Sequence, residues 1–472
     1  MAELPRLIIA APQGRSGKTT LTLGLCAAFR AHGLYVQPFK KGPDYIDPSW
    51  LSEAAGHPCY SLDPFFYDQP EALIRAFSSA AQKADLSLVE GNHGLFDSFD
   101  EAGSGSTAAV ARTLHAPILL VVNATRIGRS IAAIVHGCQS FEPETPIAGV
   151  VLNQVAQGRH EARLRQAIES HCGIPVVGAI PRAEKLNIPD RHLGLIPREE
   201  NDALLPVIAA CKQTVEQHLD LRTVLEIARS APPLLQPEQP HTPAPEKQAL
   251  PVRIGIFRDR AFTFYYPDNL AALEEAGAEL VFMDSLNDPM LPDVDALYIG
   301  GGFPEIFMEE LSANAQLRAA IHQAVEQNLP VYAECGGLMY LSQRIRWGDR
   351  SAEMVGVLPC EIEMTGKPQG HGYVIAEVET ENPFFAPGSV LRGHEFHNSR
   401  LHAVSGGQNQ DCLPTCYRLA RGNGLGNGRD GILYRNVLAS YTHLHQGGAP
   451  GWAGGLVKQA ALYRQSKQTL AR

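Results

Sequence analysis

The first thirty or so residues constrain the fold most, because they read as a strand, a tight turn and a helix in direct succession. The short apolar run "RLIIAA" (6–11) predicts a strand, and "PQGRSG" (12–17) predicts a turn. From Lys18 to about His32 the pattern predicts a helix that ends at Gly33. The start of a helix after such a turn presents backbone N–H groups and a positive end, which together bind phosphate.

The turn also carries most of a phosphate-binding signature. It ends in Gly-Lys-Thr-Thr, although Pro12 stands where the first glycine of G-x-x-x-x-G-K-[ST] is expected. Pro12 changes how the chain enters the loop and leaves its donors intact. We expect Lys18 to reach the terminal phosphates of ATP and Thr19 to hold Mg²⁺; a chance strand-turn-helix is the alternative. The predicted nucleotide-binding residues of the loop are Gly14, Gly17, Lys18, Thr19 and Thr20.

The rest of the chain repeats the strand-loop-helix order on both sides of a proline-rich segment. Short, continuous apolar runs of this kind are typical of parallel strands covered by helices on both faces. Before the segment we predict strands at 6–11, 35–39, 86–90, 117–122, 147–152 and 175–180; after it, at 252–257, 278–283, 294–299 and 329–333. The pattern predicts an α/β protein with two doubly wound domains, the first a sheet like that of P-loop nucleotide hydrolases. We expect a nucleotide-binding domain over 1–230, a stiff linker over 231–250 and a second domain over 251–472.

Acidic residues follow the predicted strands of the first domain. Asp44 and Asp47 follow the second strand, Glu90 ends the third, and Asp97 comes shortly after it. Ligands of open α/β sheets gather at the carboxyl ends of strands, so these side chains are candidates for Mg²⁺ binding or substrate positioning. An aspartate in a loop is more often a turn or cap residue, which stays the alternative. The predicted metal ligands are Thr19, Glu90 and Asp44.

The second domain places a cysteine where a nucleophile is expected. Cys335 follows a strand and precedes two glycines and a helix, and this order matches a nucleophile elbow. We expect the helix N-terminus to lower the pKa of the thiol. His443 ends a later predicted strand in "LASYTHLHQ" (438–446), so it is the candidate base. The exposed amides of "YIGGGFPE" (298–305) are candidates for an oxyanion hole; an inert buried cysteine is the alternative.

Composition excludes several classes of protein. Apolar residues make up 44% of the 472 residues, which indicates a globular chain, and the net charge of −10 argues against nucleic acid as a partner. We expect no membrane span and no signal peptide, and therefore a cytoplasmic protein. The nine scattered cysteines do not form a disulfide framework, and Cys412 and Cys416 lack the further ligands of a zinc site.

Motifs along nearly the whole chain resemble those of cobyrinate a,c-diamide synthases. They are "VQPFKKGPDYIDP", "RHLGLIPREE", "FTFYYPDNLAALEEAGAEL", "YIGGGFPE", "ECGGLMYL", "GHEFHNS" and "SYTHLH". The resemblance implies an ATP domain like that of dethiobiotin synthetase joined to a class I glutaminase domain. It implies that ATP activates the a and c acetate carboxylates of a tetrapyrrole (cobyrinate or hydrogenobyrinate) as acyl phosphates, and that ammonia from glutamine, or free ammonia, converts them to amides.

The resemblance also implies roles for single residues. Cys335 is the nucleophile and His443 its base, and Asp44, Glu90 and Asp97 belong to the synthetase site together with Lys18 and Thr19. Asn153 matches a position that contacts adenine in related ATP domains. The implied small-molecule partners are ATP, glutamine and a polycarboxylate tetrapyrrole, and a homodimer is possible.

The chain departs from the family pattern at several positions. His445 stands where class I glutaminases commonly have the glutamate of a catalytic triad, a feature that this family tends to share. Asn92, His93, Ser98 and Lys41 differ from the residues of many relatives beside the expected substrate site. They leave siroheme or sirohydrochlorin open as the macrocycle. A cobyric-acid-synthase-like amidase and a P-loop ATPase switch are further alternatives.

A polycarboxylate substrate needs a basic lining in an acidic protein. The candidates for that lining are Lys40, Lys41, Arg191, His192 and Arg392; ordinary surface charge is the alternative.

Overall fold

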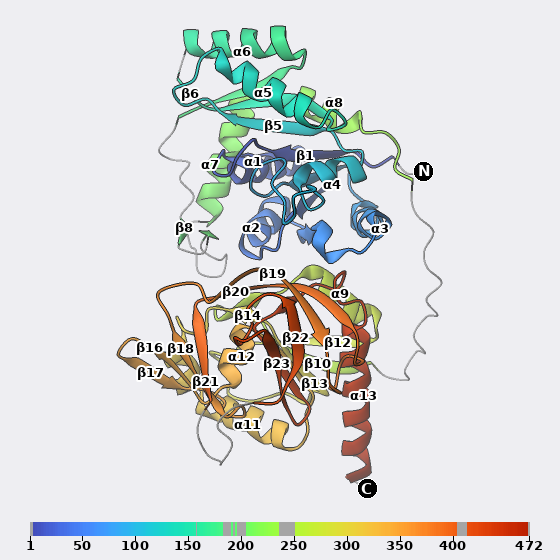
Figure 1. The fold of residues 1–472 in the computed structure, drawn as a ribbon, viewed down its shortest axis with the longest axis vertical. Coiled ribbons are helices and arrows are strands. Elements are labelled where there is room, and N and C mark those ends of the chain that lie inside the picture. The colour runs from blue at the N-terminus through green and yellow to red at the C-terminus, as the bar shows by residue number, and fades with distance from the viewer. Residues whose placement is uncertain are drawn as a thin grey trace. The chain divides into compact units, whose positions relative to one another are not determined.

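The computed structural model divides the chain into two compact units, residues 1–240 and 241–472, each with its own sheet and core (Figure 1). It describes residues 3–156, 158–182, 190–191, 194–195, 204–235, 251–403 and 413–470. The predicted boundaries at 230 and 251 stay a prediction. Within the predicted linker, Pro232 accepts a hydrogen bond from the buried Arg6 side chain and Leu234 is buried in the core of the first unit.

The first unit is built around a seven-stranded parallel sheet with the strand order β3-β2-β4-β1-β5-β6-β7. The strands predicted before the linker are all present in it, and their residues are almost entirely buried. The strands are β1 (Arg6–Ala10), β2 (Val36–Lys40), β3 (Tyr60–Ser61), β4 (Leu86–Glu90), β5 (Ile118–Asn123), β6 (Ile147–Val155) and β7 (Val176–Pro181). A pair of short strands, β8 (Asp190–Arg191) and β9 (Gly194–Leu195), forms a separate ladder.

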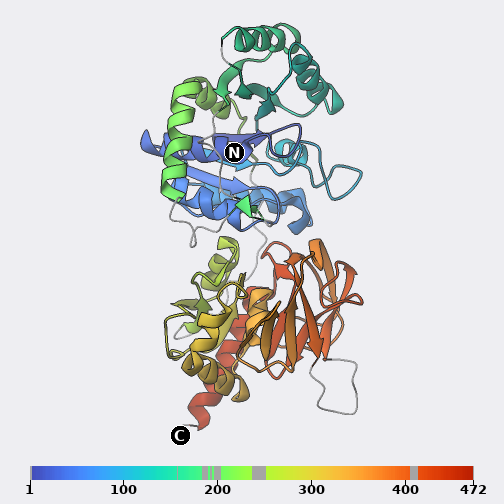
Figure 2. The same ribbon diagram turned by 90° about the vertical axis from the view of Figure 1, so that its left-hand side faces the viewer.

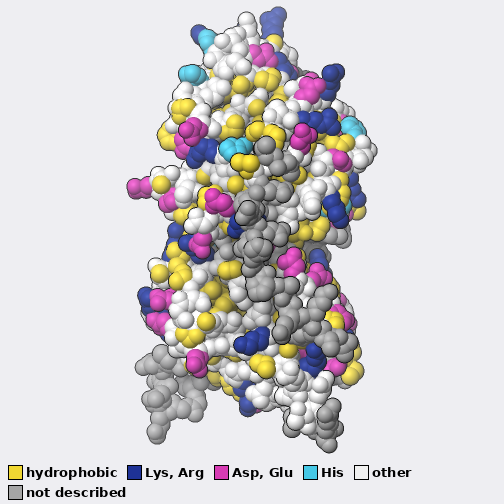
Figure 3. Space-filling view, turned by 90° about the vertical axis from the view of Figure 1, so that its right-hand side faces the viewer, with side chains coloured by type: hydrophobic (Ala, Val, Ile, Leu, Met, Phe, Trp, Pro, Cys, Tyr) yellow, Lys and Arg dark blue, Asp and Glu magenta, His cyan; other side chains and the backbone are white. Residues whose placement is uncertain are grey.

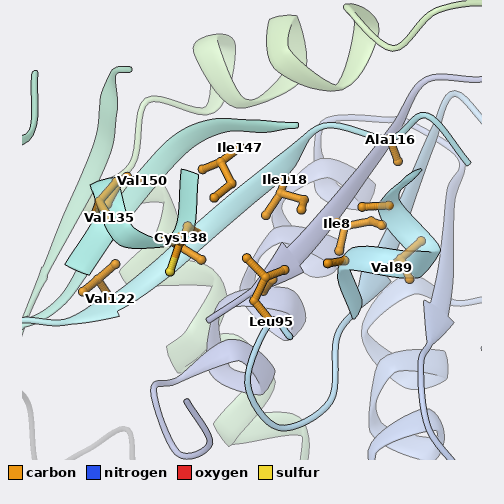
Figure 4. Packing of buried hydrophobic residues seen from close by; sticks show 14 of the residues in the cluster. Ile8, Val89, Leu95, Ala116, Ile118, Val122, Val135, Cys138, Ile147 and Val150 are labelled. Carbon is orange, nitrogen blue, oxygen red and sulfur yellow. The ribbon is translucent and has the colours of Figure 1, made fainter. Parts of the chain in front are cut away.

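Helices cover both faces of this sheet. The helices are α1 (Lys18–Ala31), α2 (Ile46–Ala55), α3 (Pro70–Ala81), α4 (Thr107–Thr113), α5 (Ser130–Phe141), α6 (Arg159–Cys172), α7 (Leu204–His218) and α8 (Leu221–Arg229), with a 3₁₀ turn at Pro64–Phe66. One apolar cluster joins α3, α4, α5 and α6 to one face, and Figure 4 shows Val135 and Cys138 of α5 within it. On the other side, α1 packs so closely on α7 that a side chain at Gly24 would meet Val215 and the Cys211 carbonyl. Burial on both faces accounts for the continuous apolar runs of the strands.

The second unit, coloured from yellow-green to red in Figure 2, has a ten-stranded sheet that is parallel in one half and antiparallel in the other. Its order is β12-β10-β13-β15-β24-β23-β22-β19-β20-β25, and the first five strands are parallel. The four strands predicted between 252 and 333 form that parallel half together with β24, which begins the strand predicted before His443. The antiparallel strands β19, β20, β22 and β23 were not predicted. The strands of this sheet are β10 (Val252–Phe257), β12 (Ala278–Met283), β13 (Ala296–Ile299), β15 (Val331–Glu334), β19 (Gly370–Val378), β20 (Val390–His397), β22 (Thr415–Arg421), β23 (Arg429–Tyr434), β24 (Val437–Ser440) and β25 (His443–Leu444).

Smaller ladders and helices complete the described part of this unit. The ladders pair β11 (Phe262–Phe264) with β14 (Gly301–Gly302) and join β16 (Arg344–Trp347), β17 (Arg350–Glu353), β18 (Cys360–Met364) and β21 (Ser399–Ala403). The helices are α9 (Pro267–Glu275), α10 (Met308–Ala313), α11 (Ala315–Glu326), α12 (Gly336–Leu341) and α13 (Trp452–Leu470). Two apolar clusters lie against the sheet, one under α10, α11 and α12 and the other under α9 and α13.

Charged side chains of both signs and free cysteines characterise the described residues (Figure 3). On the face drawn in Figure 3, basic and acidic side chains are interspersed over the described residues. None of the helices in the described ranges combines the length and the apolar character that crossing a membrane requires. The eight described cysteines are all free thiols, and Cys412 lies outside the described residues.

Candidate functional site

The phosphate loop joins β1 to α1 at the carboxyl edge of the first sheet. Gly17 has a left-handed backbone (φ +97°), and a Cβ there would lie 2.2 Å from the Asn153 side-chain nitrogen, so glycine is required. The same nitrogen of Asn153 donates a hydrogen bond of 2.8 Å to the Ser16 carbonyl. Asn153 therefore anchors the loop from the end of β6, while its contact with adenine stays a prediction. Gly14 has open space around it, and Thr20 is half-buried.

The two residues that follow Gly17 point toward the carboxyl end of β4. Lys18 is buried, and its Nζ donates a hydrogen bond of 2.7 Å to the His93 carbonyl. Burial lowers the pKa of Lys18, and the negative charge of Glu90 opposes that effect. The Thr19 hydroxyl donates a hydrogen bond of 2.7 Å to Oε1 of Glu90. The structure thus brings Lys18, Thr19 and Glu90 together, as the sequence predicts.

A lysine lies at the centre of the predicted acidic cluster. Lys40 ends β2 directly opposite Glu90, which ends β4. Its Nζ is 2.7 Å from Glu90 Oε1, 2.5 Å from Asp47 Oδ2 and 3.9 Å from Asp44 Oδ2. Burial opposes the charge of Lys40, yet Asp47, Glu90 and Asp44 raise its pKa well above the ordinary value. Sequence reasoning could have placed Lys40 beside Glu90 from the fact that each residue ends a predicted strand of the same parallel sheet.

The other predicted acids position loops around this cluster. Oδ1 of Asp44 accepts the N–H groups of Ile46 and Asp47 at the start of α2, and burial together with Asp47 raises the pKa of Asp44 to about 7. Oδ2 of Asp97 accepts the N–H of Gly94 at 2.7 Å. A Cβ at Gly94 would lie 2.8 Å from the Pro12 carbonyl, so Asp97 holds its loop against the phosphate loop.

The residues present fit Mg²⁺ bound through one carboxylate. Burial raises the pKa of Glu90 although Lys40 opposes the effect, and its Oε2 has no hydrogen-bond partner among the described residues. The described ranges contain no cluster of three or more acidic, histidine or cysteine side chains that could hold a metal. Mg²⁺ commonly takes one or two carboxylates and completes its shell with phosphate oxygens and water. Thr19 and Glu90 fit that arrangement, while Asp44 faces Lys40 and the backbone of α2.

The predicted basic lining is only partly described. Lys41 is buried with its Nζ 4.0 Å from Asp63, and burial lowers its pKa more than Asp63 raises it. Arg392 is half-buried in β20 of the second unit. Arg191 is described only as backbone of β8, and His192 lies outside the described residues.

Cys335 forms a strained turn at the carboxyl end of β15. Its φ of +47° is rare for a residue with a side chain, as expected at a nucleophile elbow. The Cys335 N–H donates to the Ser440 carbonyl at the end of the adjacent parallel strand β24. The expected lowering of the thiol pKa is wrong for this structure, because burial and the nearby Glu305 raise the pKa of Cys335. The thiol therefore needs a base to become a thiolate.

His443 follows the strand next to that of Cys335. A Cβ at Gly301 would lie 2.4 Å from the His443 ring, and one at Gly336 would lie 3.0 Å from the Gly302 amide nitrogen. The Gly301–Gly302 strand thus touches both the base and the residue after the nucleophile. Gly301 and Gly302 are buried rather than exposed, and their role as an oxyanion hole stays a prediction.

The predicted strand ending at His443 is two strands separated by a turn. β24 ends at Ser440, and Tyr441 and Thr442 turn the chain before β25. The buried carboxylate of Asp430 makes this turn, because it accepts the N–H groups of Tyr441 and Thr442 and the Thr442 hydroxyl. Sequence reasoning missed Asp430, since it lies on a different strand.

Comparisons with known proteins agree with this division of chemistry. A family model described as "CobQ/CobB/MinD/ParA nucleotide binding domain" matches residues 7–196, and one described as "CobB/CobQ-like glutamine amidotransferase domain" matches residues 253–450. A relative from Magnetococcus marinus named "Cobyrinate a,c-diamide synthase" is 46% identical over 95% of this chain and 96% of its own length. Relatives of the same name from Methanosarcina acetivorans and Methanothermobacter thermautotrophicus are 39% and 40% identical, over 98% and 96% of this chain and 97% and 99% of their own.

Identity at this level extends over nearly the whole length of both chains. The chain therefore belongs to the cobyrinate a,c-diamide synthase family.

Proposed function

We propose that the chain converts the a and c acetate carboxylates of cobyrinate or hydrogenobyrinate to amides, with ATP and with nitrogen from glutamine or ammonia. The observation that carries the proposal is the presence of two built sites in one chain. The first is a phosphate loop beside a buried acidic cluster, and the second is a strained cysteine and a buried histidine that follow two paired strands, β15 and β24. The names of the full-length relatives supply the substrate.

In the first unit, the residues around the phosphate loop serve the activation of the carboxylate. A carboxylate is a poor acyl donor because its oxygen is a poor leaving group, and phosphorylation by ATP corrects this. Lys18 binds the phosphates, and Thr19 and Glu90 would hold Mg²⁺, which would supply charge neutralisation at the phosphates. The contact of Lys40 with Glu90 supports a role for its positive charge at the transferred phosphoryl group. A substrate carboxylate that binds Lys40 has to compete with Asp47.

In the second unit, the Cys335 sulfur attacks the side-chain amide of glutamine. His443 takes the thiol proton and returns it to the departing ammonia. The glutamyl thioester is then hydrolysed by water. Ammonia released here displaces phosphate from the activated acetate group. An enzymatic source of ammonia is useful because free ammonia is mostly protonated at neutral pH.

The decisive experiment supplies the purified full chain with ATP, Mg²⁺, glutamine and one tetrapyrrole, and follows the product mass. We expect two successive carboxyl-to-amide changes with cobyrinate or hydrogenobyrinate, and fragmentation or NMR should place them at a and c. Cys335→Ala should abolish the use of glutamine and retain the use of ammonia, whereas Lys18→Ala should stop both. The proposal fails if none of the macrocycles changes mass, or if Cys335→Ala still uses glutamine.

Parallel reactions identify the macrocycle. Sirohydrochlorin and siroheme carry similar acetate groups, so faster conversion of either one would assign the chain to that substrate instead. Amides at other side chains would indicate an enzyme of the cobyric acid synthase kind. ATP hydrolysis without any amide product would indicate a switch.

A further inference from the structure

The carboxylate of Glu334 lies beside the imidazole of His443. Glu334 is the last residue of β15 and immediately precedes Cys335. It is fully buried, and its Oε2 lies 3.6 Å from Nδ1 of His443. Its Oε1 accepts the N–H of Leu444, the residue after His443, at 3.0 Å. The carboxylate thus contacts both the backbone and the ring at the position of the base.

Neutral donors hold this carboxylate in place. The Tyr332 hydroxyl donates to Oε1 at 3.0 Å, and the Tyr298 hydroxyl donates to Oε2 at 3.3 Å. Both tyrosines are buried, and burial followed by the charge of Glu334 raises their pKa values well above the ordinary value. They therefore stay protonated and donate. These bonds stabilise Glu334 without neutralising it, so its charge is available to a cation that forms next to it.

His445, which stands at the usual place of the triad acid, has other contacts. Its Nδ1 accepts the N–H of Gly447 at 3.0 Å, so the ring proton is on Nε2. Nε2 lies 3.3 Å from Asp268, and the ring packs edge-on against Tyr266. A histidine with this arrangement does not supply the negative charge that a base such as His443 requires.

We propose that Glu334 is the positioning residue of the glutaminase site, filling the role of the triad acid for His443. This inference rests on the proposed glutaminase function. With its Nδ1–H directed at Glu334, His443 presents an unprotonated Nε2. When the Cys335 sulfur bonds to the glutamine carbonyl carbon, its proton moves to Nε2; when the carbon–nitrogen bond breaks, that proton leaves on ammonia. Glu334 stabilises the imidazolium that exists between the two steps.

The other groups around His443 do not replace Glu334. His394 of β20 stacks on the ring at 4.9 Å, and burial together with the neighbouring histidines lowers the pKa of His394 well below its ordinary value, so it is neutral. Asp430 accepts backbone and hydroxyl hydrogen bonds from the turn before His443, and Glu305 acts on the Cys335 thiol. Phe264 is an apolar side chain whose ring lies edge-on to the imidazole.

The test is Glu334→Gln in the full chain, because an amide keeps the shape and can still accept from Leu444 and Tyr332. Its NH₂ group would then face Nδ1 and favour the wrong tautomer of His443. We expect kcat for glutamine hydrolysis to fall by about 10²- to 10⁴-fold with little change in KM. Ammonia-dependent amidation and the unfolding temperature should stay at the parent level. Alkylation of Cys335 by iodoacetamide, followed by mass spectrometry, should require a higher pH.

Asp268→Asn is the matched control, since it removes a carboxylate beside the other buried histidine. It should leave both the glutaminase rate and the alkylation profile unchanged. Glu334→Asp keeps the negative charge but moves it away from His443, so its rate of glutamine hydrolysis should be intermediate.

Several outcomes would overturn the inference. One is an unchanged pH dependence of Cys335 alkylation in Glu334→Gln. Another is a loss of glutamine hydrolysis in Asp268→Asn equal to that in Glu334→Gln. A parallel loss of ammonia-dependent activity and thermal stability would show a merely structural role. If Cys335→Ala abolishes glutamine use while Glu334→Gln retains it, the inference fails and the proposed function stands. If Cys335→Ala retains glutamine use, the proposed function itself fails.

Discussion

Lys40 and Lys41 are adjacent buried lysines, and we expect them to affect stability very differently. Lys40 makes two short contacts with carboxylates, and its pKa is raised despite burial. Lys41 reaches Asp63 only at 4.0 Å, and burial lowers its pKa. Nearby carboxylates therefore compensate the buried ammonium of Lys40 much better than that of Lys41. Substitution by methionine, which keeps the unbranched stem, tests this difference.

We expect Lys40→Met to lower the free energy of unfolding of the first unit by about 3–5 kcal/mol, because Glu90 and Asp47 are left without their cation. Lys41→Met should cost about 1 kcal/mol or less, since a poorly compensated ammonium is removed and Asp63 keeps the N–H of Phe65.

Hydrogen exchange read by mass spectrometry on peptides of β2 and β4 is the suitable assay, since it reports on the first unit within the intact chain. A loss of about 3–5 kcal/mol corresponds to exchange that is roughly a hundred- to a few thousandfold faster, at about 1.4 kcal/mol per tenfold.

The pH dependence gives a second test of the same reasoning. Burial raises the pKa of Glu90, and without Lys40 it should rise further. A carboxyl whose pKa is raised on folding destabilises the protein above that pKa and no longer does so once the pH falls below its value in the unfolded chain, about 4. The difference in the free energy of unfolding between Lys40→Met and the parent should therefore become smaller toward pH 4. The argument would be refuted if both substitutions lowered the free energy of unfolding equally, or if the difference between Lys40→Met and the parent did not depend on pH.

Three further changes test single contacts. Asn153→Ala removes the hydrogen bond to Ser16, and we expect the KM for ATP to rise by about two- to tenfold in steady-state assays, with the rate with excess ATP largely retained. Asp430→Asn should destabilise the second unit by about 2 kcal/mol and slow glutamine hydrolysis, because one amide oxygen cannot accept all the donors of the turn before His443; equilibrium denaturation and ammonia release measure the two effects. Removing Mg²⁺ with EDTA should stop amidation from either nitrogen source and leave glutamine hydrolysis intact, and hydrolysis lost with the metal would contradict the separation of the two sites.

The local part of each site could be predicted from the sequence, because it follows a strand end. Lys18 and Thr19 meet Glu90 because the loop before them follows β1, the parallel neighbour of β4, and apolar runs reveal such strands. Cys335 could be located in the same way, from the two glycines and the helix that follow it.

The remainder depends on contacts between distant segments. Glu334 reads as an ordinary strand residue until β15 and β24 are paired, which brings it beside His443 more than a hundred positions later. The antiparallel half of the second sheet was missed for a related reason. Its strands are partly exposed and carry many polar residues, so they lack the continuous apolar runs of the parallel half. The predicted direction of the Cys335 pKa shift was wrong. Burial, which only the packed structure shows, raises the pKa and opposes the effect of the helix N-terminus.

Glu90 and Glu334, the buried carboxylates of the two sites, have different kinds of hydrogen-bond partner. This difference determines how strongly each carboxylate attracts a further cation. Glu334 is held by neutral hydroxyl and N–H donors, so an imidazolium that forms at His443 meets an unscreened negative charge. The ammonium of Lys40 already lies 2.7 Å from Oε1 of Glu90. It therefore repels free Mg²⁺ that approaches Oε2, which has no hydrogen-bond partner within the described part of the chain.

It follows that Mg²⁺ should bind the parent chain tightly only together with ATP, whose phosphates supply the missing negative charge. In Lys40→Met the repulsion is absent, and free Mg²⁺ should bind without nucleotide and restore part of the lost stability. Calorimetric titration of both chains with MgCl₂ measures this difference. Equal affinity of the parent and the variant for the free metal would show that Lys40 does not control access to Glu90.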